Sequence, residues 1–300
     1  MNSDEERAYT SMPYLFHILL SQNIKYNSRF TEEMPFRQNL SKSLTVFKCT
    51  RNPIKVARGL SRFRQDGFYE VDLEFKDGTK FSGVPVGAAW MLISYYYWSH
   101  GKACYSQSDL EVLHSLGQEI YSNLKKQCGH WVKEMWGLQG THGIVFMLVR
   151  KLKPNLIIET GIAHGYSARI ILEALKMNGK GKLVSMDISE SLTLCEKTLT
   201  QGWLVPQEIR ESWTPIVGDS RKVLESISEH PDIFIHDSAH NEEYMMSEYN
   251  WASRMLLPGG YLVSDDIDRS EAWVKFHHQN PGYERYVETY TTGVSIKNRQ

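Results

Sequence analysis

The chain is poor in cysteine and has no long apolar run. Its 300 residues include four cysteines, and none lies in a C-x-x-C pair or at zinc-ligand spacing from histidine. We therefore expect reduced thiols, no disulfide framework and no zinc site, as in a cytoplasmic protein. The apolar run at residues 14–20 is too short to span a membrane, and the polar start MNSDEER does not resemble a signal peptide.

An excess of charge of either sign is also missing. The 34 basic and 35 acidic residues leave a formal net charge of −1. This balance argues against a general nucleic-acid binder, and nothing in the chain indicates a membrane partner. The length exceeds what one compact α/β domain requires, so we expect an additional region beside the main domain.

The most informative segment is residues 156–168, LIIETGIAHGYSA. An apolar run reaches Glu159, turns at Gly161 and opens a helix after Gly165. Glycine allows backbone to approach a ligand, and a helix N-terminus offers free N–H groups. The spacing is G-x-x-x-G, with a side chain as large as His164 inside the turn, whereas a dinucleotide site requires G-x-G-x-x-G. The turn therefore suits a cofactor without phosphate, for which S-adenosylmethionine (SAM) is the obvious candidate.

Four more short apolar runs follow, and each ends in an acidic residue. The runs are 182–187, 214–219, 232–237 and 260–266, with helix-like segments at 168–177, 191–199, 221–229 and 241–256. Alternating strands and helices predict a Rossmann-like, mostly parallel sheet with helices on both faces. Ligands bind outside the carboxyl ends of such strands, where all these acids lie. The alternative for any single acid is a helix cap.

The first 130 residues differ from the rest. They predict a mainly helical extension with a β-hairpin at 68–81, around Asp77-Gly78, and a helix at 106–127. We expect this extension to serve as a cap, a substrate cover or a dimer contact. At the other end, 283–289 and 293–297 predict an antiparallel hairpin that closes the sheet.

Two clusters in the extension allow a functional or an ordinary interpretation. A basic face at positions 51–64 would dock an acidic carrier protein or a phosphorylated substrate, or would simply be solvated. It comprises Arg51, Lys55, Arg58, Arg62 and Arg64. An aromatic run at 88–98 would line a substrate cover or a dimer contact, or would belong to the core.

The motifs resemble those of class I SAM-dependent methyltransferases, especially the catechol O-methyltransferase-like branch. The resemblance lies in ETGIAHGYSA at 159–168, HDSAHNEEY at 236–244 and LLPGGYLVSDDI at 256–267. The segment WGLQ at 136–139 is similar to the one that precedes this motif in cephalosporin-hydroxylase-like and antibiotic-biosynthesis enzymes. The resemblance covers residues 131–300, a methyltransferase domain, and residues 1–130 match no family that we identify.

This resemblance implies a seven-stranded sheet whose last strand is antiparallel, with SAM over the carboxyl ends of the first strands. Asp187 would accept hydrogen bonds from both ribose hydroxyls, the alternative being a helix cap. Gly161 would allow the approach of the methionine part, and Ser167 would receive its carboxylate. The implied cofactor-binding residues are Glu159, Gly161, Gly165, Ser167, Asp187, Asp219 and Ser220.

The chemistry gathers after the fourth and fifth strands. Asp237, Asp265 and Asp266 would repel one another without a compensating cation, and oxygen ligands favour Mg²⁺ or another hard divalent cation. The catechol methyltransferase-like family carries its metal ligands in this arrangement. Capping, or pairing with Arg269, is the alternative.

A histidine follows Asp237 by three residues, where the resembled family carries a catalytic lysine. Histidine titrates near neutrality, so His240, with Asp237, is our candidate for catalysis. His236 is expected to pack against the core.

The sequence thus predicts a SAM-dependent O-methyltransferase that modifies a hydroxyl of a small, secondary metabolite with divalent-metal assistance. The alternatives are a metal-independent N- or C-methyltransferase and a catalytically silent SAM-fold module. The expected partners are a small hydroxylated substrate and, in addition, a second copy in a homodimer or a carrier protein.

Overall fold

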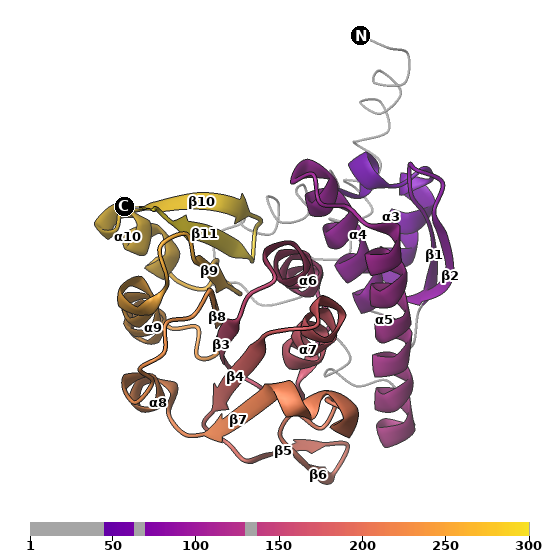
Figure 1. The fold of residues 1–300 in the computed structure, drawn as a ribbon. Coiled ribbons are helices and arrows are strands. Elements are labelled where there is room, and N and C mark those ends of the chain that lie inside the picture. The colour runs from indigo at the N-terminus through magenta and orange to yellow at the C-terminus, as the bar shows by residue number, and fades with distance from the viewer. Residues whose placement is uncertain (1–44, 63–69, 130–136, 300) are drawn as a thin grey trace, which may run out of the picture. The chain divides into compact units, whose positions relative to one another are not determined.

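The computed structural model describes residues 45–62, 70–129 and 137–299. The described residues form two compact units (Figure 1). Within these ranges, unit 1 comprises residues 45–62, 70–125, 129 and 137–140, and unit 2 comprises residues 126–128 and 141–299. Trp136, in the motif at 136–139, lies outside the described residues.

Unit 1 contains the predicted hairpin and two long helices. Strands β1 (Glu70–Glu74) and β2 (Lys80–Pro85) pair antiparallel. Gly78 has a φ of 97° in the turn between them, where Asp77 accepts a hydrogen bond from the Thr79 N–H. These strands accompany α3 (Pro53–Arg62), α4 (Val86–Gly101) and α5 (Gln107–Cys128). The hairpin predicted at 68–81 is confirmed from residue 70 onward, since 68 and 69 lie outside the described residues. The helix predicted at 106–127 is confirmed as α5, which Ser106 caps by accepting from the Asp109 N–H.

The sheet of unit 2 has seven strands in the order β10-β11-β9-β8-β3-β4-β7. The strands are β3 (Leu156–Thr160), β4 (Lys182–Asp187), β7 (Trp213–Val217), β8 (Ile233–His236), β9 (Tyr261–Ser264), β10 (Tyr283–Glu288) and β11 (Gly293–Lys297). Strands β9, β8, β3, β4 and β7 run parallel, and β11 is antiparallel to both neighbours. The predicted seven-stranded, mostly parallel sheet is confirmed.

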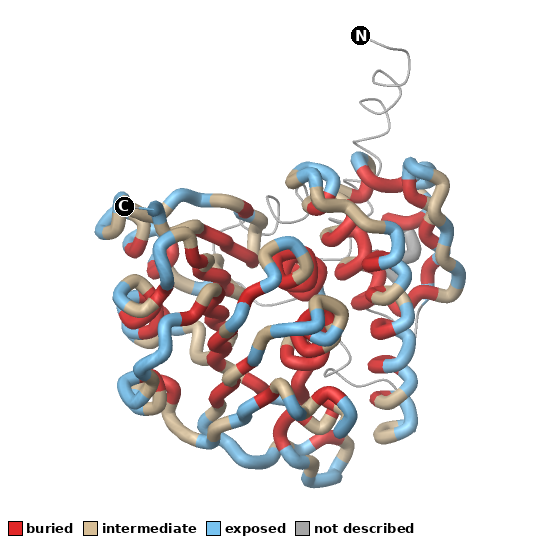
Figure 2. The backbone as a smooth tube through the Cα atoms, in the orientation of Figure 1, coloured by how far each residue is buried: buried red, intermediate tan, exposed pale blue. Residues whose placement is uncertain are grey.

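Helices cover both faces of this sheet, as Figure 1 shows. One face carries α6 (Gly140–Leu152) and α7 (Tyr166–Asn178). The other carries α8 (Ser220–Glu225), α9 (Glu242–Met255) and α10 (Ala272–Gln279). A short 3₁₀ helix, η2 (Gln207–Ser212), precedes β7. The central strands are buried, and the exposed residues gather at helix surfaces and loops (Figure 2).

The helix predicted at 191–199 is wrong. Strands β5 (Ser191–Leu194) and β6 (Lys197–Thr200) form an antiparallel hairpin there. Cys195 and Glu196 form its two-residue turn with φ values of 51° and 64°. The alternation of Leu192, Thr193 and Leu194 suits a strand better than a helix face.

The cysteine prediction is wrong for one pair. Cys128, at the end of α5, forms a disulfide with Cys195. Cys49 and Cys104 are free thiols. The pairing depends on a contact between residues 67 positions apart, so cysteine spacing along the chain gave no sign of it.

Across the described ranges, no helix is both long and apolar enough to cross a membrane.

Candidate active site

The turn between β3 and α7 needs glycine at two positions for backbone reasons. Gly161 has a φ of 89°, and a Cβ there would lie 1.8 Å from the carbonyl oxygen of Asp237. Gly165, the N-cap of α7, has a φ of 88°, and its Cβ would lie 2.9 Å from the Cα of Gly202. The turn therefore packs tightly against the residues after β8 and places Ser167 in the first turn of α7.

Glu159 is fully buried at the carboxyl end of β3 and only half satisfied. Its Oε2 accepts a hydrogen bond of 2.7 Å from the Ser185 hydroxyl, whereas Oε1 has no partner among the described residues. Burial raises the pKa of Glu159 to about 7, although the Ser167 and Ser185 hydroxyls oppose this shift. A buried acceptor without a donor suits a cationic ligand group above it.

Asp187 connects the end of β4 to the glycine turn. Its Oδ2 accepts from the backbone N–H groups of Ile162, at 2.8 Å, and Ala163, at 3.0 Å. Its Oδ1 accepts a longer bond, 3.3 Å, from the Ser189 N–H. One carboxylate thus shapes the turn and remains partly exposed at the carboxyl edge.

Two exposed apolar side chains lie at the same edge, and sequence reasoning missed them. Ile188 follows β4 and is 73% exposed, and Val217, at the end of β7, is 55% exposed. Val217 pairs with Asp187 across the neighbouring strands. The signal available in the sequence was their position beside the acids Asp187 and Asp219 at the ends of two predicted strands. Such side chains offer an apolar surface for a planar ligand group.

Asp219 and Ser220 contact other protein groups. Asp219 caps α8, pairs with the Arg221 guanidinium at 3.1 Å and accepts from the Tyr244 hydroxyl at 2.7 Å. These bonds, first from Arg221 and then from Tyr244, lower the pKa of Asp219 to about 2. Ser220 is buried and donates to Glu248 at 2.5 Å. Asp219 is therefore observed as a helix cap, the alternative role that the sequence allowed for any single acid.

Glu248 is the centre of a buried hydrogen-bond network that sequence reasoning missed. Its carboxylate receives hydrogen bonds from the hydroxyls of Thr160, Ser220 and Ser238, at 2.6, 2.5 and 2.8 Å. The fourth contact is with His236 Nδ1, at 2.5 Å. The signal was present, because Glu248 lies on the buried stripe of α9 with the apolar positions 245, 249 and 252.

Asp237, His240, Asp265 and Asp266 meet where β8 and β9 end. His240 Nε2 lies 3.9 Å from Asp237 Oδ1 and 3.7 Å from Asp266 Oδ2. Burial, and secondarily the charge of Asp265, raises the pKa of Asp237 well above its ordinary value. Burial, then Asp266, raises that of Asp265 to about 6. The structure thus brings together the four residues that we expected to carry the chemistry.

The pKa of the histidine in this cluster, His240, is lowered from its ordinary value. Burial lowers the pKa of His240, and the nearby Asp266 carboxylate only partly opposes it. The imidazole is therefore neutral over a wider pH range than a free histidine. Among the described residues its Nδ1 is buried without a hydrogen-bond partner, while Nε2 faces the carboxylates. A neutral imidazole in this position can accept a proton.

These carboxylates do not have the arrangement of a metal centre. Over the part of the chain that the structure describes, no group of three or more His, Cys, Asp or Glu side chains converges as metal ligands do. Thr141 donates to Asp265 Oδ1 at 2.7 Å, and Arg269 pairs with Asp266 at 3.3 Å. With Asp265 bound to Thr141 and Asp266 to Arg269, the three aspartates do not converge on one point, so no chemical step is derived through a cation.

Comparison with known proteins agrees with this geometry. Residues 158–267 match the family model described as a methyltransferase domain. No curated protein matches the chain.

Solved structures with a similar fold include three methyltransferases. The O-methyltransferase TomG of Streptomyces achromogenes, in complex with SAM, is 16% identical, with a TM-score of 0.44 over 61% of this chain and 89% of its own. A Podospora anserina methyltransferase bound to S-adenosylhomocysteine (SAH) is 14% identical, with a TM-score of 0.47 over 62% and 87%. An O-methyltransferase of Bacillus cereus in complex with SAH is 15% identical, with a TM-score of 0.42 over 71% and 100%.

The family match lies wholly within unit 2 and spans its glycine turn, its acid-terminated strands and the His240 cluster. The sheet order and the antiparallel β11 agree with the fold that the motifs implied. Residues 158–267 of the C-terminal unit therefore match a methyltransferase domain, on a sheet of the order described above.

Proposed function

We propose that the protein transfers the methyl group of SAM to a hydroxyl of a small metabolite. One observation carries the proposal: a buried acceptor suited to a cation lies beside a cluster suited to proton removal. Glu159 Oε1 is the acceptor, and His240 with Asp237 forms the cluster. Gly161 brings the two together, because the Asp237 carbonyl packs directly against it.

The residues on the cofactor side of the site have the chemistry that the groups of SAM require. The ammonium group of its amino-acid end would donate to Glu159 Oε1, and Ser167 with the first turn of α7 would receive the carboxylate. Asp187 would face the ribose, and Ile188 and Val217 would flank the adenine. SAM supplies an electrophilic methyl group when it is bound.

On the acceptor side, His240 takes the proton of the substrate hydroxyl through Nε2. The new O–C bond forms as the S–C bond of the sulfonium breaks, which leaves SAH, the methyl ether and a protonated His240. The carboxylate of Asp266, at 3.7 Å, stabilises the positive charge that develops on the imidazole, and Asp237 flanks it at 3.9 Å. General-base assistance of this kind contributes roughly a hundredfold to ten-thousandfold.

We propose in addition that a divalent cation assists the transfer. Three carboxylates from two neighbouring strand ends supply the oxygen donors that Mg²⁺ prefers, if Asp265 and Asp266 release Thr141 and Arg269. The test is turnover after chelation and dialysis. Loss of activity that Mg²⁺ restores supports the metal-assisted form, and full activity in chelator establishes the metal-independent form.

Two experiments test the proposal. Calorimetry of the full chain with SAH should show binding, and NAD should show none; the reverse result refutes the cofactor assignment. His240→Ala should then lower methyl transfer to hydroxylated acceptors at least a hundredfold and flatten the acid limb of the pH–rate profile, with SAH affinity unchanged. His278→Ala, at an exposed histidine of α10, is the matched control.

Two outcomes favour the alternatives. Methyl transfer confined to nitrogen or carbon acceptors favours an N- or C-methyltransferase. SAH binding without transfer to any acceptor in a broad panel favours a silent binding module.

A further inference from the structure

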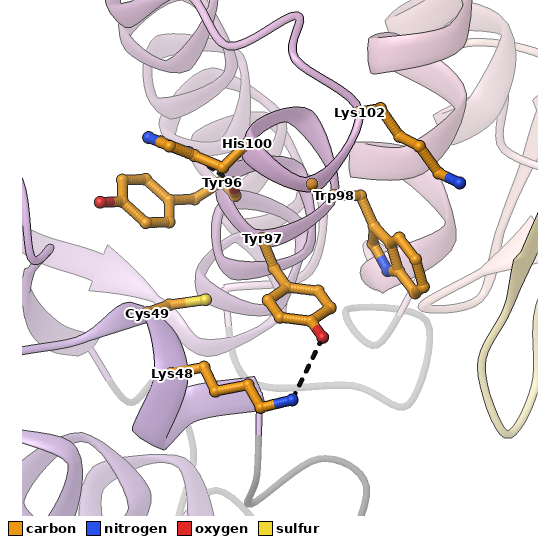
Figure 3. Close-up of a pocket in the computed structure, with 8 residues that line it drawn as sticks. Lys48, Cys49, Tyr96, Tyr97, Trp98, His100 and Lys102 are labelled. Atoms are coloured by element: carbon orange, nitrogen blue, oxygen red, sulfur yellow. Dashed lines mark hydrogen bonds between the residues drawn. The ribbon is translucent and has the colours of Figure 1, made fainter.

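Unit 1 contains a pocket that methyl transfer does not use. Its volume is about 410 Å³, within the range of roughly 300–1,000 Å³ that small-molecule sites occupy. The pocket lies at the C-terminal turn of α4 and beside the segment that carries Lys48 (Figure 3). Its lining residues are Lys48, Cys49, Tyr96, Tyr97, Trp98, His100, Gly101 and Lys102.

The aromatic wall of the pocket consists of one buried ring, Tyr96, and two half-buried rings, Tyr97 and Trp98. Tyr96 is buried and stacks on Phe75 with a centroid distance of 4.4 Å, so it anchors the wall. Tyr97 and Trp98 are only half-buried and meet edge to face at 5.1 Å. Their rings therefore offer both a flat face and an edge to a planar molecule.

Lys48 supplies a positive charge that no carboxylate neutralises within the described residues. Its ammonium lies 3.4 Å from the Tyr97 hydroxyl and 5.5 Å from the centre of that ring (Figure 3). Three other cations of unit 1, Arg51, Lys55 and Lys80, pair with carboxylates of β1. Lys48 differs from them in facing the aromatic pocket with N–H donors to spare.

The second lysine of the lining removes an obstacle to anion binding. A helix C-terminus carries partial negative charge, which would repel an anion. Lys102 is the C-cap residue of α4, so its charge offsets that of the helix end. The carbonyls of Trp98, Ser99 and His100 accept hydrogen bonds from the N–H groups of residues 102–104 and are not bare toward the pocket.

The remaining lining groups favour a ligand that binds without forming a covalent bond to the protein. Burial raises the pKa of the Cys49 thiol to about 12, so the sulfur is neither an anion nor an effective nucleophile. No carboxylate belongs to the lining. The ammonium of Lys48 suits a monoanion, whereas phosphate recognition usually uses an arginine fork or several backbone N–H groups.

We propose that this pocket binds a small aromatic carboxylate, with its ring against Tyr97 and Trp98 and its carboxylate on Lys48. Such a ligand matches the aromatic rings of Tyr97 and Trp98, the ammonium of Lys48 and the volume of the pocket together. The site lies entirely in unit 1, so the proposal does not depend on methyl transfer in unit 2.

Calorimetric titration of the full chain, saturated with SAH, tests this proposal with 2-naphthoate as the probe. The uncharged isostere 2-naphthamide is the ligand control. We expect 2-naphthoate to bind at least tenfold more tightly than the amide, because only the acid makes a charge-assisted contact. Absence of 2-naphthoate binding, or equal affinity for the two compounds, overturns the proposal.

Variants then locate the binding. Lys48→Met should weaken 2-naphthoate at least tenfold and leave 2-naphthamide nearly unchanged, and Trp98→Leu should weaken both. Lys55→Met, at an exposed lysine paired with Asp72, should change neither. Thermal melts verify that each variant is folded. Unchanged 2-naphthoate affinity in Lys48→Met would place the probe elsewhere and refute the site. The SAH titration reports on unit 2 separately, so the two proposals succeed or fail independently.

Discussion

His236 Nδ1 lies 2.5 Å from Glu248 Oε2, and both side chains are completely shielded from solvent. Burial alone would raise the pKa of Glu248, but the hydrogen bonds from His236, Ser220 and Thr160 outweigh it and hold the pKa below its ordinary value. Glu248 is therefore ionised in the folded protein. Its carboxylate joins the ends of β3 and β8 to the start of α8, directly beneath the proposed site.

Replacing this carboxylate should destabilise the fold. Glu248→Gln removes the charge that His236 faces and leaves fewer acceptors for four donors, so we expect a loss of about 3–5 kcal/mol in unfolding free energy. Urea denaturation measures it, with Glu225→Gln, at the exposed end of α8, as control. Because the folded pKa of Glu248 is depressed, its contribution is present above the unfolded pKa and is lost as the pH falls through the folded pKa. Equal denaturation midpoints for the two variants would contradict the role of the network.

Glu159 should give the ligand-free protein a stability that falls as the pH rises. Its pKa is about 7 when folded against an ordinary 4.5, so the folded state binds more protons between these values. The contribution is complete below about pH 4.5 and is lost by about pH 7, a change of about 3 kcal/mol. Asp265 adds a slope of the same sign up to about pH 6.

The Glu159→Gln variant isolates this effect. Urea midpoints measured from pH 4.5 to 8 should fall less steeply for the variant than for the parent protein. Identical slopes would show that Glu159 is already ionised in the folded state. SAH affinity should in turn rise with pH up to about 7 in the parent protein, because the ammonium group of SAH favours the ionised carboxylate.

Asp187→Ala should weaken SAH binding at least tenfold. The change removes two bonds to the glycine turn and the proposed ribose contact, and a charge-assisted hydrogen bond contributes about 1.5–3 kcal/mol. The matched control is Asp232→Ala, because Asp232 also accepts from two backbone N–H groups, those of Asn155 and Leu156, where β3 begins. The control should lose stability but keep its SAH affinity. Equal losses of affinity in calorimetry would assign Asp187 to folding alone.

Reduction should destabilise unit 2. The bond between Cys128 and Cys195 closes a loop of 67 residues, and such cross-links contribute about 2–4 kcal/mol. A reductant should lower the melting temperature of the parent protein and of Cys104→Ser. The melting temperature of Cys128→Ser should be lower than that of the parent protein from the start, and the reductant should not change it further. Four titratable thiols in the denatured, unreduced protein would show that the bond does not form.

The sequence predicted the elements whose signals are local. Apolar runs ending in acids located β3, β4, β7, β8 and β9, and the Asp77-Gly78 turn located the hairpin of unit 1. The glycine spacing at 161 and 165 located the turn that faces the proposed cofactor site.

What the sequence missed depends on partners distant in the chain. The hairpin at 191–200 is cross-linked to Cys128, and a helical pattern gave no sign of that pairing. His236 packs in the core as expected. Its hydrogen-bond partner Glu248, which sequence reasoning missed, lies on α9. Two positions of the predicted basic face, Arg51 and Lys55, pair with carboxylates of β1, whereas Arg64 lies outside the described residues.

The close approach of Gly161 to the Asp237 carbonyl also limits which residues position 161 can accept during evolution. Any larger residue at position 161 would collide with backbone, whether or not a ligand is bound. A descendant that lost all catalysis would therefore still retain this glycine in order to fold. Glu159 differs, because its Oε2 accepts from Ser185 while its Oε1 has no partner among the described residues. The glycine is thus required for the fold itself, whereas the unpaired oxygen of Glu159 is the feature that a bound cationic group would explain.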